Sequence, residues 1–199
     1  MTQHRNPLMD LALVAVFAAL IVVFSLTPAI PLPGNAVPIT LQTLAVALTA
    51  MIIGPWRGAA ATGLYLAVGF AGLPVFAGGA SGVAVLARPS AGYLISFPIY
   101  AIVVGLLAQW ALRRATGWKP LLLIIAGLVG SFLVVHPMGI IGMSRLIPVP
   151  LQKAFMLDLA FWPGDLVKTI LAACIAVTVH KAFPALLVGR RTQHQPANA

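Results

Sequence analysis

The sequence predicts an all-α integral membrane protein with six transmembrane helices. Hydrophobic residues make up 61% of the 199-residue chain, charged residues make up 8%, and the mean hydropathy is +1.03. A water-soluble domain carries about 25% charged residues, so a chain with so few could not cover a surface in contact with water. The apolar residues form six runs close to the roughly 20 residues that a helix needs to cross a bilayer. The lipid bilayer is therefore its expected surroundings.

The first three spans are predicted at residues 8–26, 38–53 and 59–73. The first is apolar except for Asp10 near its start, and turn-forming residues follow it at 28–35. Proline, glycine and asparagine in such a cluster are incompatible with a continuous helix. The second span ends at the Gly-Pro-Trp-Arg-Gly sequence of residues 54–58, after which the third begins.

The last three spans are predicted at residues 92–112, 120–143 and 164–187. Within the second of these lies His136-Pro137, and we expect the imidazole to cap backbone groups that the proline frees. Pro163 is expected to start the last span, because proline is favoured in the first turn of a helix. Residues 144–163 have a mixed composition and are assigned no span.

The basic residues indicate the orientation of this membrane domain, which covers residues 8–187. With six spans, both termini lie on one side, and eight Lys and Arg fall on that side against four on the other. The side richer in basic residues is normally cytoplasmic. We therefore predict a multi-pass protein of the bacterial inner (cytoplasmic) membrane, with cytoplasmic tails at residues 1–7 and 188–199.

Residues 74–91 are glycine-rich and too apolar for an ordinary aqueous loop. Irregular backbone at membrane depth occurs where it is buried in protein or lines a cavity. This segment, the proline-rich first loop and the start of the last span all fall on the predicted outer side. The sequence thus predicts a binding site where an external ligand would arrive.

Composition also argues against several classes of function. The net charge of +9 comes from basic residues that stand singly or in pairs between apolar runs, whereas a nucleic-acid binder gathers them into a patch that neutralises phosphates. No Gly-x-x-x-x-Gly-Lys-Ser/Thr phosphate-binding loop occurs, so the chain is not expected to hydrolyse ATP unaided. We expect no enzymatic activity, no cofactor, no metal site and no nucleic-acid partner.

Asp165 and Lys168 are the most informative charged pair. They are three residues apart in the last span and therefore share one helical face. Ionisable side chains within membrane spans usually face a cavity or a partner, because each costs roughly 2.5–3.5 kcal/mol at the bilayer centre. The spacing alone fits either a mutual salt bridge or a site that binds a ligand with polar ends.

Two other functional classes are compatible with these residues. An ion-coupled or passive carrier or channel is one, with Asp165 placed to couple to protons. The other is an intramembrane serine protease, because residues 79–82 match the Gly-x-Ser-Gly pattern of rhomboid proteases, with Ser81 as nucleophile and His180 as base. A nucleophile and its base must lie within about 3 Å. Ser81 and Asp165 both fall near the predicted outer side, whereas His180 lies some 18–22 Å further along the last span than Asp165. The spacing therefore argues against the protease.

Five separated motifs together resemble the BioY family, the biotin-specific substrate-capture (S) components of energy-coupling-factor (ECF) importers. Each motif is weak alone, but their order and spacing are specific, and the resemblance covers residues 8–187. The motifs are Val-Pro-Ile-Thr-Leu-Gln-Thr-Leu at 37–44, Gly-Pro-Trp-Arg-Gly at 54–58, Gly-Leu-Pro-Val-Phe-Ala-Gly-Gly at 72–79, Pro-Ser-Ala-Gly-Tyr-Leu at 89–94, and Pro-Gly-Asp with the following lysine at 163–168.

The resemblance implies the six-helix S-component fold and high-affinity capture of biotin from the outer side. It also implies a transmembrane coupling protein and a pair of ATPases as partners, which alone would hydrolyse ATP. Ala15 and Ala19 on the first span correspond to the Ala-x-x-x-Ala face with which this fold contacts the coupling protein. Small residues at that spacing otherwise serve helix packing within one protein.

The resemblance also implies a biotin site. Asp165 would accept the ureido N–H groups, and Lys168 or Arg88 would hold the carboxylate. The other implied contacts are a wall from Tyr93, a cap from Gln42, and close approach of the ligand to Gly78, Gly79 and Ser81. Some family members have a polar residue and a basic residue where this chain has Ala80 and Leu94, so Arg88 is the candidate replacement for the missing cation.

Overall fold

The computed structural model describes residues 7–32, 37–114 and 117–186. Apart from Pro7, which begins the first helix, the two predicted cytoplasmic tails lie outside the described residues. Residues 33–36 of the proline-rich first loop also lie outside them.

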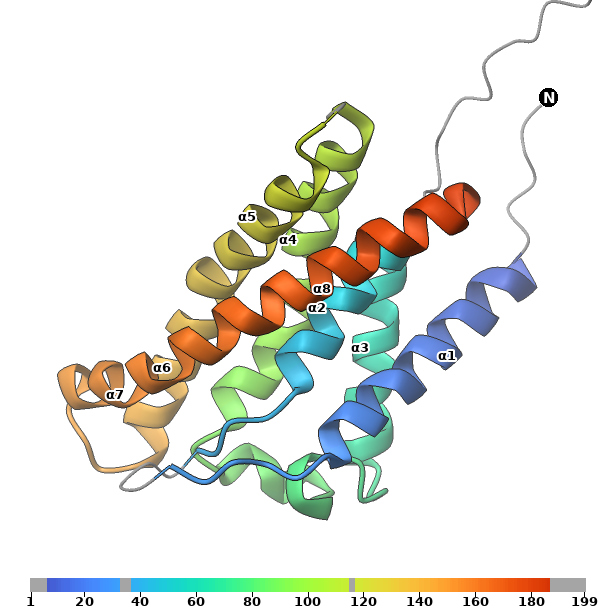
Figure 1. The fold of residues 1–199 in the computed structure, drawn as a ribbon. Coiled ribbons are helices and arrows are strands. Elements are labelled where there is room, and N and C mark those ends of the chain that lie inside the picture. Colours follow the sequence, from blue (N-terminus) through green and yellow to red (C-terminus); the bar gives the residue numbers. More distant parts are fainter. Residues whose placement is uncertain (1–6, 33–36, 115–116, 187–199) are drawn as a thin grey trace, which may run out of the picture.

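The described chain is helical, and its helices form one bundle (Figure 1). The single helices are α1 (Pro7–Leu26), α2 (Gln42–Ile53), α3 (Pro55–Phe70) and α4 (Ala91–Arg114). Two longer helical stretches follow, the first made of α5 (Lys119–Gly130), the π-turn η3 (Ser131–Val135) and α6 (His136–Leu146), and the second of α7 (Leu151–Asp158), η4 (Leu159–Phe161) and α8 (Trp162–Ala182). Short 3₁₀ turns are η1 (Ala77–Gly79), η2 (Val83–Ala87) and η5 (Pro184–Leu186).

The all-α prediction is confirmed, and a helix lies at each of the six predicted spans. Four helical stretches of the described chain are long and apolar enough to cross a membrane, namely Pro7–Leu26, Ala91–Arg113, Lys119–Leu146 and Leu151–Ala182. Helices α2 and α3 are shorter, with 12 and 16 residues. The segment 144–163, to which the sequence assigned no span, contains α7 and runs on into α8.

Helix α2 is the centre of the bundle. Every residue in it except Thr43 is buried, and it packs against α3, α4 and α8. A helix that is apolar all round is expected to be buried on all sides, which explains why α2 can be short. Its start is four residues later than the predicted span because Ile39 is extended and exchanges two backbone hydrogen bonds of 2.9 Å with Ile30.

Glycine allows α4 and α6 to cross very closely. A Cβ atom added to Gly142 of α6 would lie 2.7 Å from the Cα atom of Gly92 in α4, closer than real carbon contacts. The ring of Tyr93 packs over Gly139, where a Cβ atom would collide with it. The close crossing therefore fixes the start of α4, and with it Tyr93, against α6.

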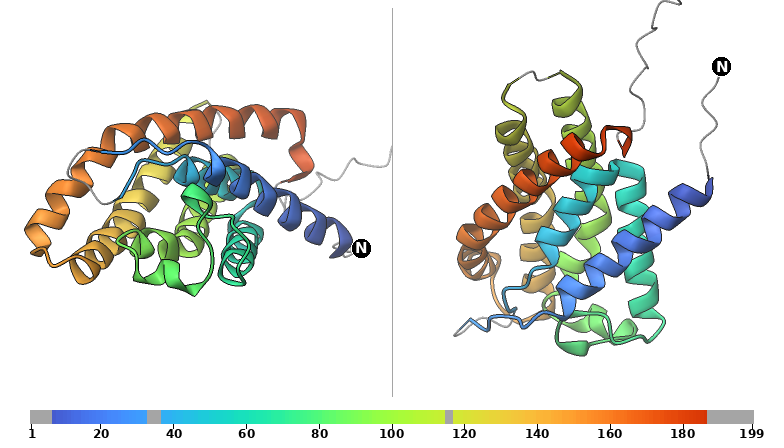
Figure 2. Two further views of the ribbon diagram at one scale, coloured as in Figure 1. Left: turned by 90° about the horizontal axis from the view of Figure 1, so that it is seen from below. Right: turned by 45° about the vertical axis from the view of Figure 1, so that its right-hand side comes forward.

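The loops at one end of the bundle carry the predicted binding elements. Residues 27–32 and 37–41 run across this end next to residues 71–90, as Figure 2 shows from below. The start of α8 lies at the same end, whereas the start of α1 and the last turn of α8 lie at the opposite end (Figure 1).

Candidate functional site

A cavity of about 200 Å³ opens between these loops, α2, α4 and α8. Its polar lining consists of Thr40, Gln42, Thr43, Arg88, Ser90, Tyr93, Asp165 and Lys168. The first loop, the 74–91 segment and the start of α8 therefore meet around one cavity, as the sequence predicted. Thr43 and Asp165, which meet at this cavity, are 122 residues apart along the chain, so only the fold brings them together.

An ion pair on the first turns of α8 forms the charged part of the cavity. Pro163 stands in the first turn, as predicted. Lys168 Nζ lies 2.7 Å from Asp165 Oδ1, and both residues are buried, with 8% and 5% of their surface exposed. Thr43 of α2 joins them, because its hydroxyl lies 3.1 Å from Asp165 Oδ1 and 3.2 Å from Lys168 Nζ. The salt bridge that the spacing allowed is thus present, and it faces a cavity.

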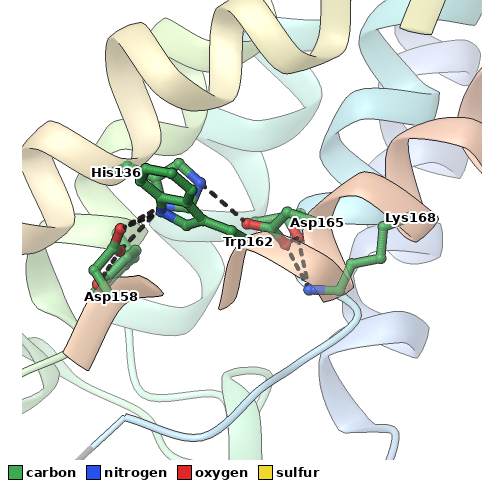
Figure 3. A network of polar contacts seen from close by, with 7 residues as sticks. His136, Asp158, Trp162, Asp165 and Lys168 are labelled. Carbon is green, nitrogen blue, oxygen red and sulfur yellow. Dashed lines mark hydrogen bonds and ion pairs between the residues drawn. The ribbon is translucent and has the colours of Figure 1, made fainter. Parts of the chain in front are cut away.

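A second polar cluster lies beside Asp165, on the side away from Lys168 (Figure 3). His136 Nδ1 is 3.0 and 2.9 Å from the two carboxylate oxygens of Asp158, and its Nε2 is 3.6 Å from Asp165 Oδ2. Asp158 is fully buried and also accepts hydrogen bonds from Tyr93 Oη–H (2.8 Å) and Trp162 Nε1–H (2.9 Å). The prediction that His136 caps the backbone is wrong, since both ring nitrogens face carboxylates.

The remaining walls of the cavity are apolar. Aromatic and aliphatic side chains from four separate segments provide them, namely Phe76, Val85, Leu94, Phe97, Val135 and Phe161. The six are buried. A cavity with apolar walls and a few converging polar groups is typical of a small-molecule site.

The predicted site residues are distributed unevenly around this cavity. Gln42, Arg88, Tyr93, Asp165 and Lys168 line it. Arg88 is exposed at the loop end, and in the described part of the chain it forms no ion pair with an acidic side chain.

Gln42 is already engaged within the protein. Its amide nitrogen donates to Ser25 Oγ at 3.1 Å and Tyr65 Oη at 2.6 Å, while its amide oxygen accepts from Thr40. These contacts tie the start of α2 to α1 and α3 and hold the amide at the cavity edge.

Gly78, Gly79 and Ser81 are not among the residues that line the cavity, although their neighbours Ala77 and Ala80 are. Both glycines have positive φ angles, of 69° and 73°, which side chains rarely adopt. They shape the turn that places Ala77 and Ala80 at the cavity.

Ser81 and His180 lie at different ends of the molecule. Ser81 lies in the loops near the cavity, whereas His180 Nε2 lies 2.8 Å from the carbonyl oxygen of Met51, near the end of α2. A serine nucleophile must contact its base. The geometry therefore argues against the protease interpretation.

Ala15 and Ala19 lie on the exposed side of α1, while Ala18 and Ile21 are buried against the bundle. Helix packing within this chain therefore uses a different face of α1 from the Ala-x-x-x-Ala face. The exposed face is available to a partner in the membrane.

Sequence reasoning gave no site role to Thr43, Asp158 or Trp162. Thr43 is in a motif that the sequence singled out, but its contact with Asp165 spans 122 residues. A histidine within an apolar run is itself a signal of function, which would have singled out His136, whereas Asp158 lies in the mixed segment 144–163. Their pairing could not be predicted, because it depends on how α7 folds back onto α6.

Comparison with known proteins places this geometry in a family. The model of the BioY family matches residues 1–185. The biotin transporter BioY of Rhodobacter capsulatus is 38% identical over 192 compared positions, and the match covers 91% of this chain and 98% of that protein. The biotin transporter BioY of Rhizobium etli is 35% identical over 179 residues, covering 89% and 96% of the two chains.

A solved structure gives the same result for the fold. The crystal structure of the S-component for biotin from an ECF-type ABC transporter superimposes with a TM-score of 0.80 and 27% sequence identity. The superposition covers 91% of this chain and 95% of that chain. The fold therefore matches that of an ECF S component, and the chain belongs to the BioY family.

Proposed function

We propose that this chain captures biotin from the outer side of the membrane as the S component of an ECF-type importer. The observation that carries the proposal is a cavity in which a buried carboxylate and ammonium adjoin apolar walls. The names of the relatives supply the identity of the substrate. Biotin has polar groups at both ends and an apolar bicyclic body, which suits such a cavity.

Asp165 and Lys168 together bind the ureido group in this proposal. A ureido group offers two N–H donors next to one carbonyl acceptor. Asp165 accepts from an N–H group, and Lys168, 2.7 Å away from that carboxylate, donates to the carbonyl oxygen. Hydrogen bonds to charged groups contribute about 1.5–3 kcal/mol each. One ion pair thus satisfies both kinds of polar group at this end of the ligand.

Arg88 then binds the biotin carboxylate. Lys168 and Asp165 contact each other, so they serve the same end of an extended ligand. The carboxylate is at the other end, on a flexible chain, and Arg88 is the second cation that lines the cavity. A guanidinium matches a carboxylate in bidentate geometry.

The other predicted residues complete the site. Tyr93 forms a wall, and its hydroxyl stays bound to Asp158. Gln42 holds the start of α2 beneath the first loop, which covers the ligand. Gly78, Gly79 and Ser81 stay predicted contacts that the 74–91 segment makes when it closes on the ligand.

Transport in this proposal depends on partners. A transmembrane coupling protein docks on the exposed Ala15 and Ala19 face of α1, and a pair of ATPases hydrolyses the ATP. Exposure of these two alanines supports the docking, because small residues let helices approach closely in lipid. The tails and the cavity lie on opposite sides of the bacterial inner membrane, with the tails in the cytoplasm.

Uptake of radiolabelled biotin by cells that lack their own biotin importer tests this function. Cells that express the chain with an ECF coupling protein and ATPase pair should accumulate biotin, and an ATPase pair unable to hydrolyse ATP should abolish accumulation. Accumulation that ignores the ATPases and collapses with the proton gradient would instead support an ion-coupled carrier.

A further inference from the structure

His136 stands between two buried carboxylates, directly behind the cavity wall. Asp158 faces its Nδ1 at 3.0 and 2.9 Å, and Asp165 faces its Nε2 at 3.6 Å (Figure 3). The exposed fractions are 3% for His136, 0% for Asp158 and 5% for Asp165. At these distances the imidazole faces both carboxylates directly.

The contacts of Asp158 favour a proton on Nδ1 of His136. Trp162 Nε1–H can only donate a hydrogen bond, and it lies 2.9 Å from Asp158 Oδ2, while Tyr93 donates to Oδ1 at 2.8 Å. Both oxygens of Asp158 thus already accept a hydrogen bond, which favours the ionised carboxylate. With Asp158 ionised, His136 Nδ1 carries a hydrogen that it donates to Asp158, and the state of Nε2 is the remaining question.

A neutral imidazole leaves Nε2 in an unfavourable position. With the proton on Nδ1, Nε2 would present a lone pair to Asp165 Oδ2, and no other described residue offers it a hydrogen bond. A buried polar atom that faces only another acceptor is costly. An imidazolium removes this conflict, because Nε2–H then points to the Asp165 carboxylate.

The charges of the cluster lead to the same result. Asp158 and Asp165 bring two negative charges, whereas Lys168 brings one positive charge. A protonated His136 balances the four groups, while a neutral one leaves a buried carboxylate without a counter-ion, which is strongly unfavourable.

Among the described residues, the other elements packed on His136 supply no further cation in contact with it. From η3 the Phe132 ring packs on the imidazole, with centroids 4.9 Å apart, and from α8 the Trp162 ring lies at 5.9 Å. From α4, Tyr93 reaches the cluster through Asp158. Lys153, the basic residue of α7, is exposed.

We propose that His136 is a protonated positioning residue for the ligand site, held by Asp158 and ion-paired through Nε2 with Asp165. This inference rests on the proposal that Asp165 binds the ligand. Asp165 Oδ1 already accepts from Thr43 and Lys168. His136 orients Oδ2 and keeps its negative charge balanced, which leaves the second lone pair of Oδ2 for a ligand N–H group.

Nitrogen-15 NMR of the full chain in detergent, with labelled histidine, reads the proton directly. The chain has four histidines, and His136→Gln assigns the signal by its disappearance. At neutral pH both ring nitrogens of His136 should be protonated, with or without biotin. An unprotonated Nε2 would overturn the proposal.

Biotin affinity measures the positioning role. His136→Gln and Asp158→Asn should each weaken binding by about tenfold or more, since each disrupts the ion pairing that holds the Asp165 carboxylate in place. His180→Gln is the matched control, because His180 forms a hydrogen bond with the Met51 carbonyl away from the cavity. The biotin affinity of this variant should equal that of the wild type. Wild-type affinity in a folded His136→Gln variant would sink the positioning role.

Two further outcomes keep the test decisive. If His136→Gln does not fold, the Asp158→Asn variant takes its place. In that variant the NMR spectrum should show His136 shifted towards the neutral state, and biotin should bind more weakly. An Asp158→Asn variant that keeps the imidazolium and the wild-type affinity would contradict the proposal. If the wild type does not bind biotin, the proposed function fails, and the state of Nε2 still decides the protonation of His136.

Discussion

At the residue scale, the chemistry of the cavity depends on one carboxylate. Asp165 contacts Lys168 and Thr43 through Oδ1 and faces His136 through Oδ2. These contacts on both oxygens fix the orientation of the carboxylate. A fixed acceptor binds a ligand N–H group without first having to become ordered, which favours tight binding.

Replacing Asp165 tests this role. Asp165→Asn keeps the size of the side chain and one carbonyl oxygen but removes the charge, so biotin affinity should fall by about tenfold or more. Isothermal titration on the purified variant measures the change. Asp10→Asn is the matched control, because Asp10 pairs with Arg57 at the opposite end of the molecule and should leave affinity unchanged. A folded Asp165→Asn variant with wild-type affinity would remove Asp165 from the site.

That Arg88 binds the carboxylate and Lys168 the ureido group is a separate prediction. Arg88→Gln should lower the affinity for biotin by about tenfold or more. Its affinity for the biotin alcohol, which lacks the carboxylate, should stay close to that of the wild type. Lys168→Gln should weaken both ligands alike, because the ureido group is common to them. Competition binding with the two ligands measures the four affinities. The reverse pattern would assign the carboxylate to Lys168.

Local spacing explains which of these residues the sequence could place. Asp165 and Lys168 are one helical turn apart, so their contact follows from α-helix geometry alone. His136 and Asp158 are separated by 22 residues and a reversal of the chain. Nothing in the local sequence determines that reversal, so the buried cluster required the folded structure.

At the element scale, the apolar runs of the sequence predicted where helices lie, but they did not predict where the helices end or bend. The predicted span 120–143 is a single run in the sequence, whereas the structure inserts the π-turn η3 before His136-Pro137. Such π-turns are frequent at functional sites. This one carries Val135 into the cavity wall and leads directly to His136. Propensities do not distinguish a π-turn from an α-helix, which is why the sequence missed it.

The exposed face of α1 predicts the effect of a large residue there. Ala15→Trp should leave biotin affinity unchanged and block assembly with the coupling protein, because an indole prevents close helix approach. Co-purification with tagged coupling protein measures assembly. Ile175→Trp is the matched control, since Ile175 is 43% exposed on α8. Normal co-purification of the Ala15→Trp variant would contradict the docking site on α1.

The crossing of α4 and α6 predicts a difference between two glycines. Gly142→Ala places a Cβ atom 2.7 Å from Gly92 Cα and should destabilise the protein by about 1–3 kcal/mol, seen as a lower melting temperature. Gly63→Ala on α3 meets no atom within 4 Å, so its melting temperature should be unchanged or slightly higher. Equal melting temperatures of the two variants would mean that the crossing can relax.

At the scale of the whole molecule, the bundle separates two tasks. One end and its loops form the cavity, while Ala15 and Ala19 are exposed on α1, where we propose that a partner docks. The motifs of the sequence predicted the cavity end, because glycine and proline clusters mark the loops and charged residues mark the cavity. How deep the loops lie and which residues meet there depend on contacts between distant segments.

The central claim is that this chain alone captures biotin. Equilibrium binding of biotin to the detergent-purified protein, with thiamine and riboflavin as controls, tests it most directly. The account predicts tight, saturable binding of biotin and none of either control. A folded protein that binds no biotin would contradict the account.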